Sequence, residues 1–143
     1  MLPVMKPLLD KILFFINKYN HPLSIGWLLL CTILLLLPGN EFPTIGFLQH
    51  IYLDKWVHII IFSSLVFLFC FRFQSLKSHL MIVLVFSILG YIIEWIQKLF
   101  IPFRSFDTGD IYADIIGCIL GLLLYLTLVK KVNPCGNRGR NQN

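Results

Sequence analysis

Five of the seven acidic residues lie close to long apolar segments, where a carboxylate can serve as a general acid, a general base or a metal ligand. They are Asp54, Glu94, Asp107, Asp110 and Asp114. In Asp54–His58 (DKWVH), a carboxylate and an imidazole four residues apart share one helix face. Glu94 and Gln97, three residues apart, do the same. The candidate catalytic residues are His58 and Glu94 from these pairs, together with Asp114.

The segment after Arg104 carries an acidic stripe that becomes glycine-rich further along. On a helical wheel Asp107, Asp110, Asp114, Gly117 and Gly121 fall within about 80° of arc. The two glycines form a GxxxG pattern, which lets a neighbouring helix approach closely. The three aspartates could hold a divalent cation through oxygen ligands.

Each polar group also has a plain structural interpretation, and those alternatives stay open. Asp107 and Asp110 suit a helix N-cap and first turn, whereas Asp114 lies too deep to cap. Glu94 could pair with Lys98 along its own helix, and His58 could bond a backbone carbonyl. The candidate ligand-binding set therefore rests on the common membrane depth expected for its members: Asp54, Lys55, His58, Glu94, Gln97, Arg104, Asp107, Asp110 and Asp114.

The elements that must position these residues are membrane-spanning helices. Apolar residues make up 57% of the 143 residues and charged residues only 13%, against about 25% charged residues in soluble domains. Four spans are expected, over about residues 23–37, 56–71, 80–101 and 111–129. The fold class predicted is an all-α polytopic bundle with four transmembrane helices.

The flanking segments complete the predicted domain organisation. Residues 1–22 form an N-terminal segment whose stretch 4–19 has the periodicity of an amphipathic helix on the inner membrane surface; an extension of the first span is the alternative. No small-residue cleavage site follows that span, so we expect it to be retained. Residues 23–129 form the transmembrane domain, and 130–143 form a basic cytoplasmic tail.

The basic residues predict the orientation. With both termini in the cytoplasm, nine of the twelve lie inside: Lys6, Lys11, Lys18, Arg72, Lys77, Lys130, Lys131, Arg138 and Arg140. Only Lys55, Lys98 and Arg104 lie outside. This bias follows the positive-inside rule and places the five acidic residues at the outer face.

The same polar residues resemble the VanZ-like family, named for a teicoplanin resistance protein, over about residues 24–129. The resemblance rests on Asp54–His58, on Glu94 with Gln97, on Arg104–Asp110 (RSFDTGD), and on the later glycines. The family often carries Asn where this chain has Asp114. The resemblance implies a multi-pass protein of the bacterial plasma membrane, some of whose relatives lower susceptibility to teicoplanin-type glycopeptides.

Three functions remain open. In the first, a cell-envelope protein uses the outward polar site to bind a lipid-linked wall precursor, an anionic head group or the glycopeptide, with Lys55 and Arg104 meeting the anion. In the second, a membrane hydrolase or transferase uses the Glu, His and Asp cluster. In the third, the protein is a proton- or ion-coupled transporter. The expected partner is the lipid bilayer rather than nucleic acid, a homo-oligomer is allowed, and the sequence requires no cofactor.

Overall fold

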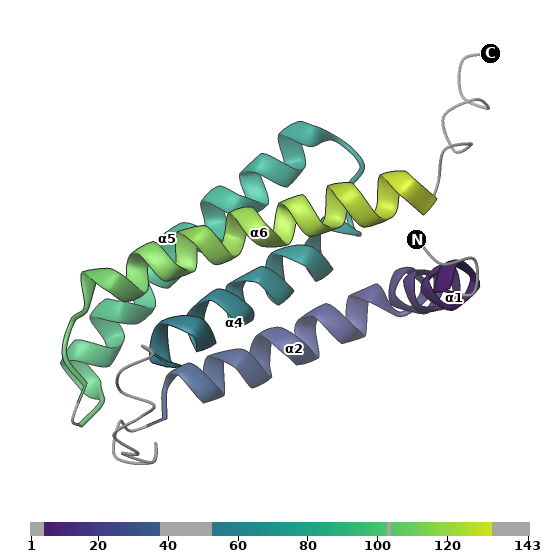
Figure 1. Cartoon of the computed structure of the whole chain (residues 1–143). Helices are drawn as coiled ribbons and strands as arrows, with labels where there is room; N and C mark the ends of the chain where they lie inside the picture. Colours follow the sequence, from purple (N-terminus) through teal and green to yellow (C-terminus); the bar gives the residue numbers. More distant parts are fainter. Residues whose placement is uncertain (1–4, 38–52, 103, 133–143) are drawn as a thin grey trace.

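The computed structural model describes residues 5–37, 53–102 and 104–132, and every regular element in those ranges is a helix. In chain order the helices are α1 (Met5–Lys18), α2 (Asn20–Leu35), α4 (Leu53–Cys70), α5 (Leu76–Phe100) and α6 (Thr108–Val132). Figure 1 shows α2, α4, α5 and α6 running alongside one another, while α1 turns away at one end. The predicted all-α class is confirmed for the described part of the chain.

Three of these helices are long and apolar enough to cross a membrane: Leu53–Cys70, Leu76–Phe100 and Thr108–Val129. Their mean hydropathies are 1.7, 2.0 and 2.1. The helix in the place of the expected first span, α2, is apolar but has only 16 residues. At 1.5 Å per residue it spans about 24 Å, less than a hydrocarbon core of about 30 Å.

The helix bounds differ from the sequence prediction by a few residues. Helix α5 begins at Leu76, because the Ser75 hydroxyl accepts a hydrogen bond from the Ser78 N–H (3.0 Å) and caps it. The segment between the expected second and third spans, 72–79, is therefore partly helical. Helix α6 continues to Val132, so the expected tail begins three residues too early. Residues 133–143, and residues 38–52 between the expected first and second spans, lie outside the described residues.

Helices α4 and α6 form the central pair, with α5 against α6 and α2 against α4. The GxxxG residues explain how closely the central pair approaches. A Cβ added to Gly117 would lie 2.7 Å from the carbonyl oxygen of Ile59, and one added to Gly121 would overlap the carbonyl oxygen of Ser63. Both glycines therefore place the α6 backbone directly on the α4 backbone.

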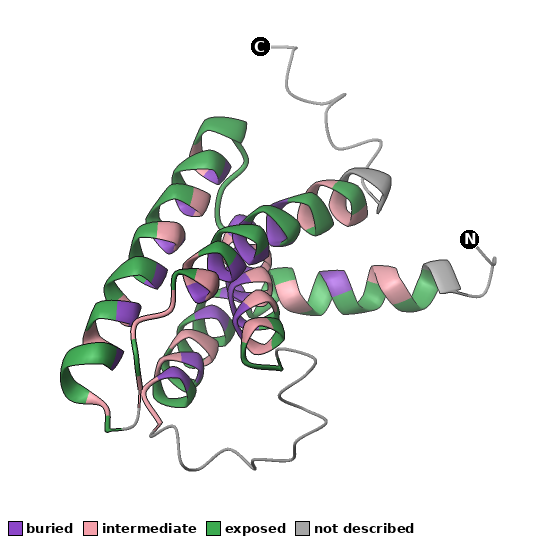
Figure 2. Ribbon diagram, turned by 60° about the vertical axis from the view of Figure 1, so that its left-hand side comes forward, coloured by how far each residue is buried: buried purple, intermediate pink, exposed green. Residues whose placement is uncertain are grey.

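Apolar side chains fill the middle of the bundle and also cover its outside. The core includes Phe62, Val66 and Phe86, together with Cys31, Cys70 and Cys118. These three cysteines are buried and unpaired, as expected of small apolar residues. Outside, Ile33 and Ile60 are both 62% exposed, and Figure 2 shows exposed residues along the outer faces of the helices. An apolar exterior of this extent suits lipid rather than water.

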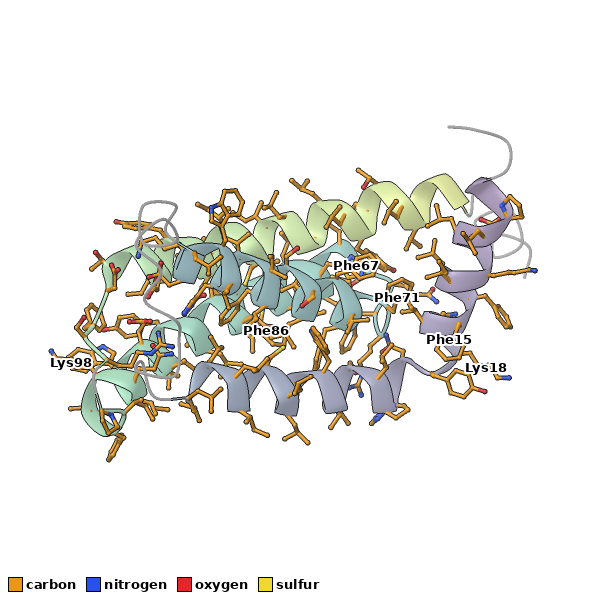
Figure 3. All side chains as sticks on the ribbon, turned by 60° about the horizontal axis from the view of Figure 1, so that its bottom comes forward. Phe15, Lys18, Phe67, Phe71, Phe86 and Lys98 are labelled. Carbon is orange, nitrogen blue, oxygen red and sulfur yellow. The ribbon has the colours of Figure 1, made fainter. Side chains whose placement is uncertain are left out.

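The two ends of the bundle carry different polar residues. At the end near α1, Asn20 and His79 each bond one backbone carbonyl, of Leu68 and Phe73 respectively, both at 2.8 Å. Figure 3 shows Lys18 at this end and Lys98 at the other. The start of α4, the end of α5 and the start of α6 meet at the Lys98 end, where the predicted site residues gather.

Candidate functional site

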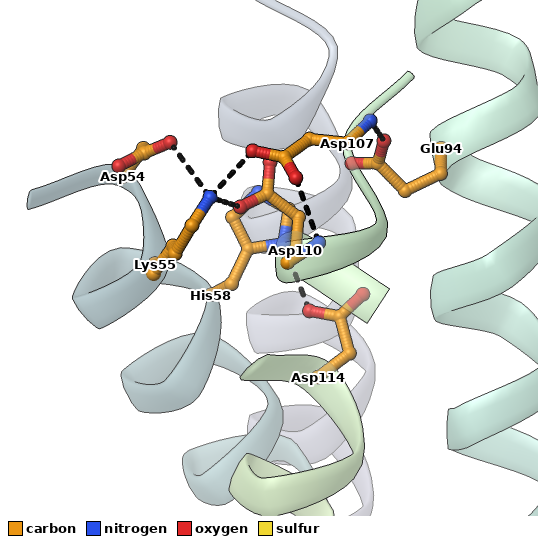
Figure 4. Close-up of polar contacts among 8 residues, drawn as sticks. Asp54, Lys55, His58, Glu94, Asp107, Asp110 and Asp114 are labelled. Atoms are coloured by element: carbon orange, nitrogen blue, oxygen red, sulfur yellow. Dashed lines mark hydrogen bonds and ion pairs between the residues drawn. The ribbon is translucent and has the colours of Figure 1, made fainter. Parts of the chain in front are cut away.

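A buried polar cluster lies where α4 begins, α5 ends and α6 begins (Figure 4). Its inner members are His58, Glu94, Asp110 and Asp114, exposed by 2%, 0%, 5% and 1%. They come from three helices: His58 from α4, Glu94 from α5 and the two aspartates from α6. Ionisable groups buried this deeply are costly unless they interact with one another or with a ligand.

Lys55 closes the outer rim of the cluster. Its ammonium nitrogen lies 2.5 Å from Asp107 Oδ2, 3.0 Å from Asp110 Oδ1 and 3.5 Å from Asp54 Oδ2. Gly109 makes this possible, because an added Cβ there would lie 2.7 Å from Lys55 Cε. The ammonium is thus already surrounded by three carboxylates.

Asp107 serves both this rim and the start of α6. Its Oδ1 accepts a hydrogen bond from the Gly109 N–H at 2.7 Å, which is N-cap geometry for a helix beginning at Thr108. The hydrogen bond from Lys55, followed by that from Gly109, lowers the pKa of Asp107 below its ordinary value. Asp107 therefore both caps α6 and belongs to the polar cluster.

His58 and Asp114 form a buried pair, with His58 Nδ1 at 2.8 Å from Asp114 Oδ1. A carboxylate oxygen accepts, so this hydrogen bond assigns the ring proton to Nδ1 and directs Nε2 elsewhere. The pair depends on Gly90 of α5. A Cβ there would overlap Asp114 Oδ2 and would lie 2.9 Å from Asp114 Cβ.

Glu94 uses one carboxylate oxygen and leaves the other unpartnered. Oε2 accepts a hydrogen bond from the backbone N–H of Asp107 at 3.1 Å, whereas Oε1 is buried without a hydrogen-bond partner among the described residues. Lys98, the alternative partner, lies over the rings of Trp95 and Phe106, 4.9 and 5.7 Å from their centroids. Glu94 therefore faces the cluster and not its own helix.

Three other predicted site residues lie at the edge of the cluster or serve the fold. Gln97 donates from Nε2 to the carbonyl oxygen of Leu35 at 2.7 Å and so ties α5 to the last turn of α2. Arg104 lies half-buried in the connector between α5 and α6. The Asp54 side chain is 50% exposed and touches the cluster only through Lys55.

The structure groups the possible metal ligands differently from the sequence prediction. Among the described residues, two sets bring their ligand atoms within 4.8 Å of one another: His58 with Glu94 and Asp110, and Asp54 with Asp107 and Asp110. Asp114 belongs to neither set. The possible trio of Asp107, Asp110 and Asp114 is not one of these sets, since Asp114 bonds His58, one turn further along α6 than Asp110.

Two residues that serve the site were missed by the sequence reasoning. Gly90 makes room for Asp114, and Gly109 makes room for Lys55. Gly109 stands within the RSFDTGD motif, so its neighbours were a usable signal. Gly90 stands alone in an apolar helix, four residues before Glu94, and only its position on the face shared with Glu94 hints at a role.

Comparison with known proteins gives one relative of uncharacterised function. The chain is similar to the uncharacterised protein C11E3.10 of Schizosaccharomyces pombe, with 31% identity over 80 residues, which cover 54% of this chain and 49% of that protein. The chain thus spans about half the length of the curated relative that it matches. It matches no protein-family model and no solved structure.

Proposed function

We propose that this chain is a multi-pass membrane protein whose buried polar cluster performs acid–base chemistry on a lipid-borne substrate, as a hydrolase or a transferase. His58 acts as the general base and acid through Nε2. Asp114 holds the ring in the required tautomer and supports the charge that forms on it. Glu94 and Asp110 bind the reacting group, and the incoming hydroxyl belongs to water or to an acceptor alcohol.

The His58–Asp114 pair carries this proposal. It is a hydrogen bond of 2.8 Å between side chains that are 3% and 1% exposed. A structural histidine needs only a carbonyl partner, as His79 has at the other end of the bundle. An imidazole fixed by a carboxylate, next to a carboxylate with an unused oxygen, is instead the arrangement that general acid–base catalysis requires.

Charge disfavours a simple anion-binding site. Lys55, which the sequence suggested would meet a phosphate or carboxylate, is already engaged by Asp54, Asp107 and Asp110. An anionic head group arriving there would compete with three carboxylates for one ammonium. Binding followed by proton transfer therefore fits the cluster better than capture of an anion by Lys55 alone.

The membrane setting proposed for this chemistry is a bacterial plasma membrane, with α2 as a fourth, short span and α1 as an amphipathic surface helix. In α1, Leu8 and Phe14 are 61% and 70% exposed, as expected of side chains that lipid covers. Lys18 lies at the opposite end of the bundle from Lys98 (Figure 3). The positive-inside rule then places both termini in the cytoplasm and the cluster at the outer face.

This placement is compatible with the VanZ-like resemblance. A lipid-linked wall precursor would reach the cluster from the outer leaflet, and its modification would lower susceptibility to teicoplanin-type glycopeptides. A proton- or ion-coupled transporter is less well supported, because Phe62, Leu65 and Val66 of α4 fill the bundle below the cluster with apolar side chains. The proton path of a transporter would instead be lined by carboxylates and histidines.

The test compares membranes that contain the wild-type chain, His58→Gln, Glu94→Gln and the control Gly26→Ala, whose added methyl group meets nothing within 4 Å. Lipids and lipid-linked precursors are profiled by mass spectrometry, and teicoplanin susceptibility is measured in parallel. We expect a product that wild type and Gly26→Ala form and the other two do not. Equal product from His58→Gln and wild type, at equal protein level, would remove His58 from the chemistry.

The orientation has a separate test. Asp54→Cys and Asp107→Cys variants, with Cys135 replaced by alanine, are treated with a membrane-impermeant thiol reagent from either side. Positions 54 and 107 are suitable because their side chains are 50% and 43% exposed. We expect labelling from the outside, and labelling only from the cytoplasm would reverse the proposed topology.

A further inference from the structure

We propose that His58, Glu94 and Asp110 bind a divalent transition-metal cation, with Asp114 orienting the histidine ligand. The ion would lie between the three helices, on the inner side of Lys55. The binding itself is a separate property of these residues, and only its use in catalysis rests on the function proposed above. With the ion bound, Nε2 of His58 would be a ligand, and a water on the ion would take the place of His58 as the group that supplies the activated hydroxyl.

The three ligand groups already converge. Their ligand atoms lie within 4.8 Å of one another, and all three residues are buried. Donor atoms in a tetrahedral zinc site, at 2.0–2.1 Å from the metal, stand roughly 3.4 Å apart. The closure required is thus of the order of 1 Å, which side-chain rotation of Glu94 and Asp110 can supply.

The His58–Asp114 hydrogen bond matches the support that histidine ligands receive in metal sites. A ligating histidine donates its other ring N–H to a carboxylate or carbonyl, which fixes the tautomer and strengthens the ligand. Here Nδ1 lies 2.8 Å from Asp114 Oδ1. The lone pair that remains for a metal is then on Nε2.

A second, independent observation is the unused oxygen of Glu94. The residue is 0% exposed, yet Oε1 is buried without a hydrogen-bond partner among the described residues. Figure 4 shows Oε2 held by the Asp107 N–H and the remaining oxygen turned toward Asp110. Such an atom costs free energy unless a ligand satisfies it.

The charges of the cluster favour the binding of a further cation. Asp54, Asp107, Asp110, Asp114 and Glu94 bring five carboxylates to one end of the bundle. Lys55 is shared among the three rim carboxylates, at 2.5–3.5 Å. Further in, Asp114 bonds the His58 imidazole and Glu94 accepts from the Asp107 N–H, so a divalent cation would offset the charge of Glu94 and part of that of Asp110.

The second set of converging carboxylates is a poorer candidate for a metal site, because Lys55 occupies its centre. Asp54, Asp107 and Asp110 also converge within 4.8 Å, but the Lys55 ammonium already lies among them. Asp110 belongs to both sets, and its Oδ1 accepts a hydrogen bond from Lys55 at 3.0 Å. One imidazole with two carboxylates suits Zn²⁺ and Mn²⁺, whereas Mg²⁺ and Ca²⁺ prefer oxygen ligands alone.

The experiment measures metal bound to the full chain, without an affinity tag, in detergent. Protein stripped with a chelator is dialysed against Zn²⁺ or Mn²⁺, and bound metal is read by mass spectrometry. Mn²⁺ is included because it avoids thiols, so that Cys135 does not contribute. We expect one ion per chain in wild type and in the control Asp54→Asn, loss in Glu94→Gln, and an affinity about 10–100-fold weaker in Asp114→Asn.

A melting curve for each variant separates loss of a metal-binding side chain from loss of the fold. If a variant fails to fold, the metal content of the wild type still tests the proposal. Absence of Zn²⁺ and Mn²⁺ from folded wild type would mean that protons balance the charge, and would overturn the proposal. So would binding of either ion that survives Glu94→Gln, whether or not Asp54→Asn reduces it. Metal bound without any lipid product would instead refute the proposed enzyme and leave the metal site standing.

Discussion

Replacing Gly90 with alanine perturbs the polar cluster without removing any polar atom from it. Gly90 lies in α5 against Asp114 of α6, and an added Cβ would lie 2.9 Å from Asp114 Cβ and 3.0 Å from its Cγ, with Oδ2 closer still. Comfortable carbon–carbon contacts begin near 3.5 Å, so Asp114 has to move by about 0.5–1 Å. Such a shift breaks or lengthens the hydrogen bond to His58.

Two opposing effects set the size of the outcome. Overpacking costs about 1–3 kcal/mol, while alanine in place of glycine in a helix returns up to about 1 kcal/mol. The net loss of stability is then about 0–3 kcal/mol, which is less than the total stability of most folded chains. Displacement of a catalytic group by about 1 Å lowers rates by about 10²-fold. We therefore expect Gly90→Ala to fold and to lose most of its product formation.

The matched control is Gly26→Ala in α2, where the added methyl group meets nothing within 4 Å. Melting temperature, product formation and the downfield proton resonance of the His58 Nδ1–H are measured for both variants. Gly26→Ala should match wild type in all three. If Gly90→Ala keeps the resonance and the product yield of Gly26→Ala, the link from Gly90 through Asp114 to His58 is refuted.

Three more outcomes follow from single contacts. Lys55 lowers the pKa of Asp107, so their interaction stabilises the fold fully above the unfolded-state pKa of about 3.9. This stabilisation is lost as the pH falls through the lowered folded-state pKa. The melting temperature of Asp107→Asn should therefore lack this contribution to the decrease at acidic pH. Gln97→Leu leaves the last-turn carbonyl of α2 without its donor and should cost about 1–3 kcal/mol, read as a lower melting temperature than that of wild type. Lys98→Gln removes contacts with aromatic rings and should leave product formation unchanged. A loss of product equal to that of Glu94→Gln would instead support a functional pair between Glu94 and Lys98.

Much of the fold could be predicted from local sequence because long apolar segments are visible in the composition alone. The segments that contain Phe62, Phe86 and Cys118 were each expected as a span, and each is a helix. Helix ends were less predictable, since capping depends on single hydrogen bonds such as that between Ser75 and Ser78. The expected first span, 23–37, was displaced along the chain, because apolar character continues to Leu37 whereas α2 begins at Asn20 and ends at Leu35.

The candidate site was predictable as a set of residues but not as a set of contacts. A helical wheel aligned Asp110 and Asp114, yet they bond different partners: Asp110 meets Lys55 and Asp114 meets His58. The wheel also put Gln97 beside Glu94, although its amide reaches α2. Periodicity assigns a face of one helix, and it contains no information about which neighbour lies against that face.

The sequence by itself determined the chemical types, their common end of the bundle and the apolar helices that carry them, because composition and the 3.6-residue period are local properties. Only the tertiary structure decided that His58 meets Asp114, that Lys55 is shared by three carboxylates and that Glu94 keeps one oxygen unpartnered. Those contacts depend on how closely α6 lies against α4 at Gly117 and Gly121 and against α5 at Gly90. The deciding quantity is the separation between helices, which is set by packing at residues that have no side chain.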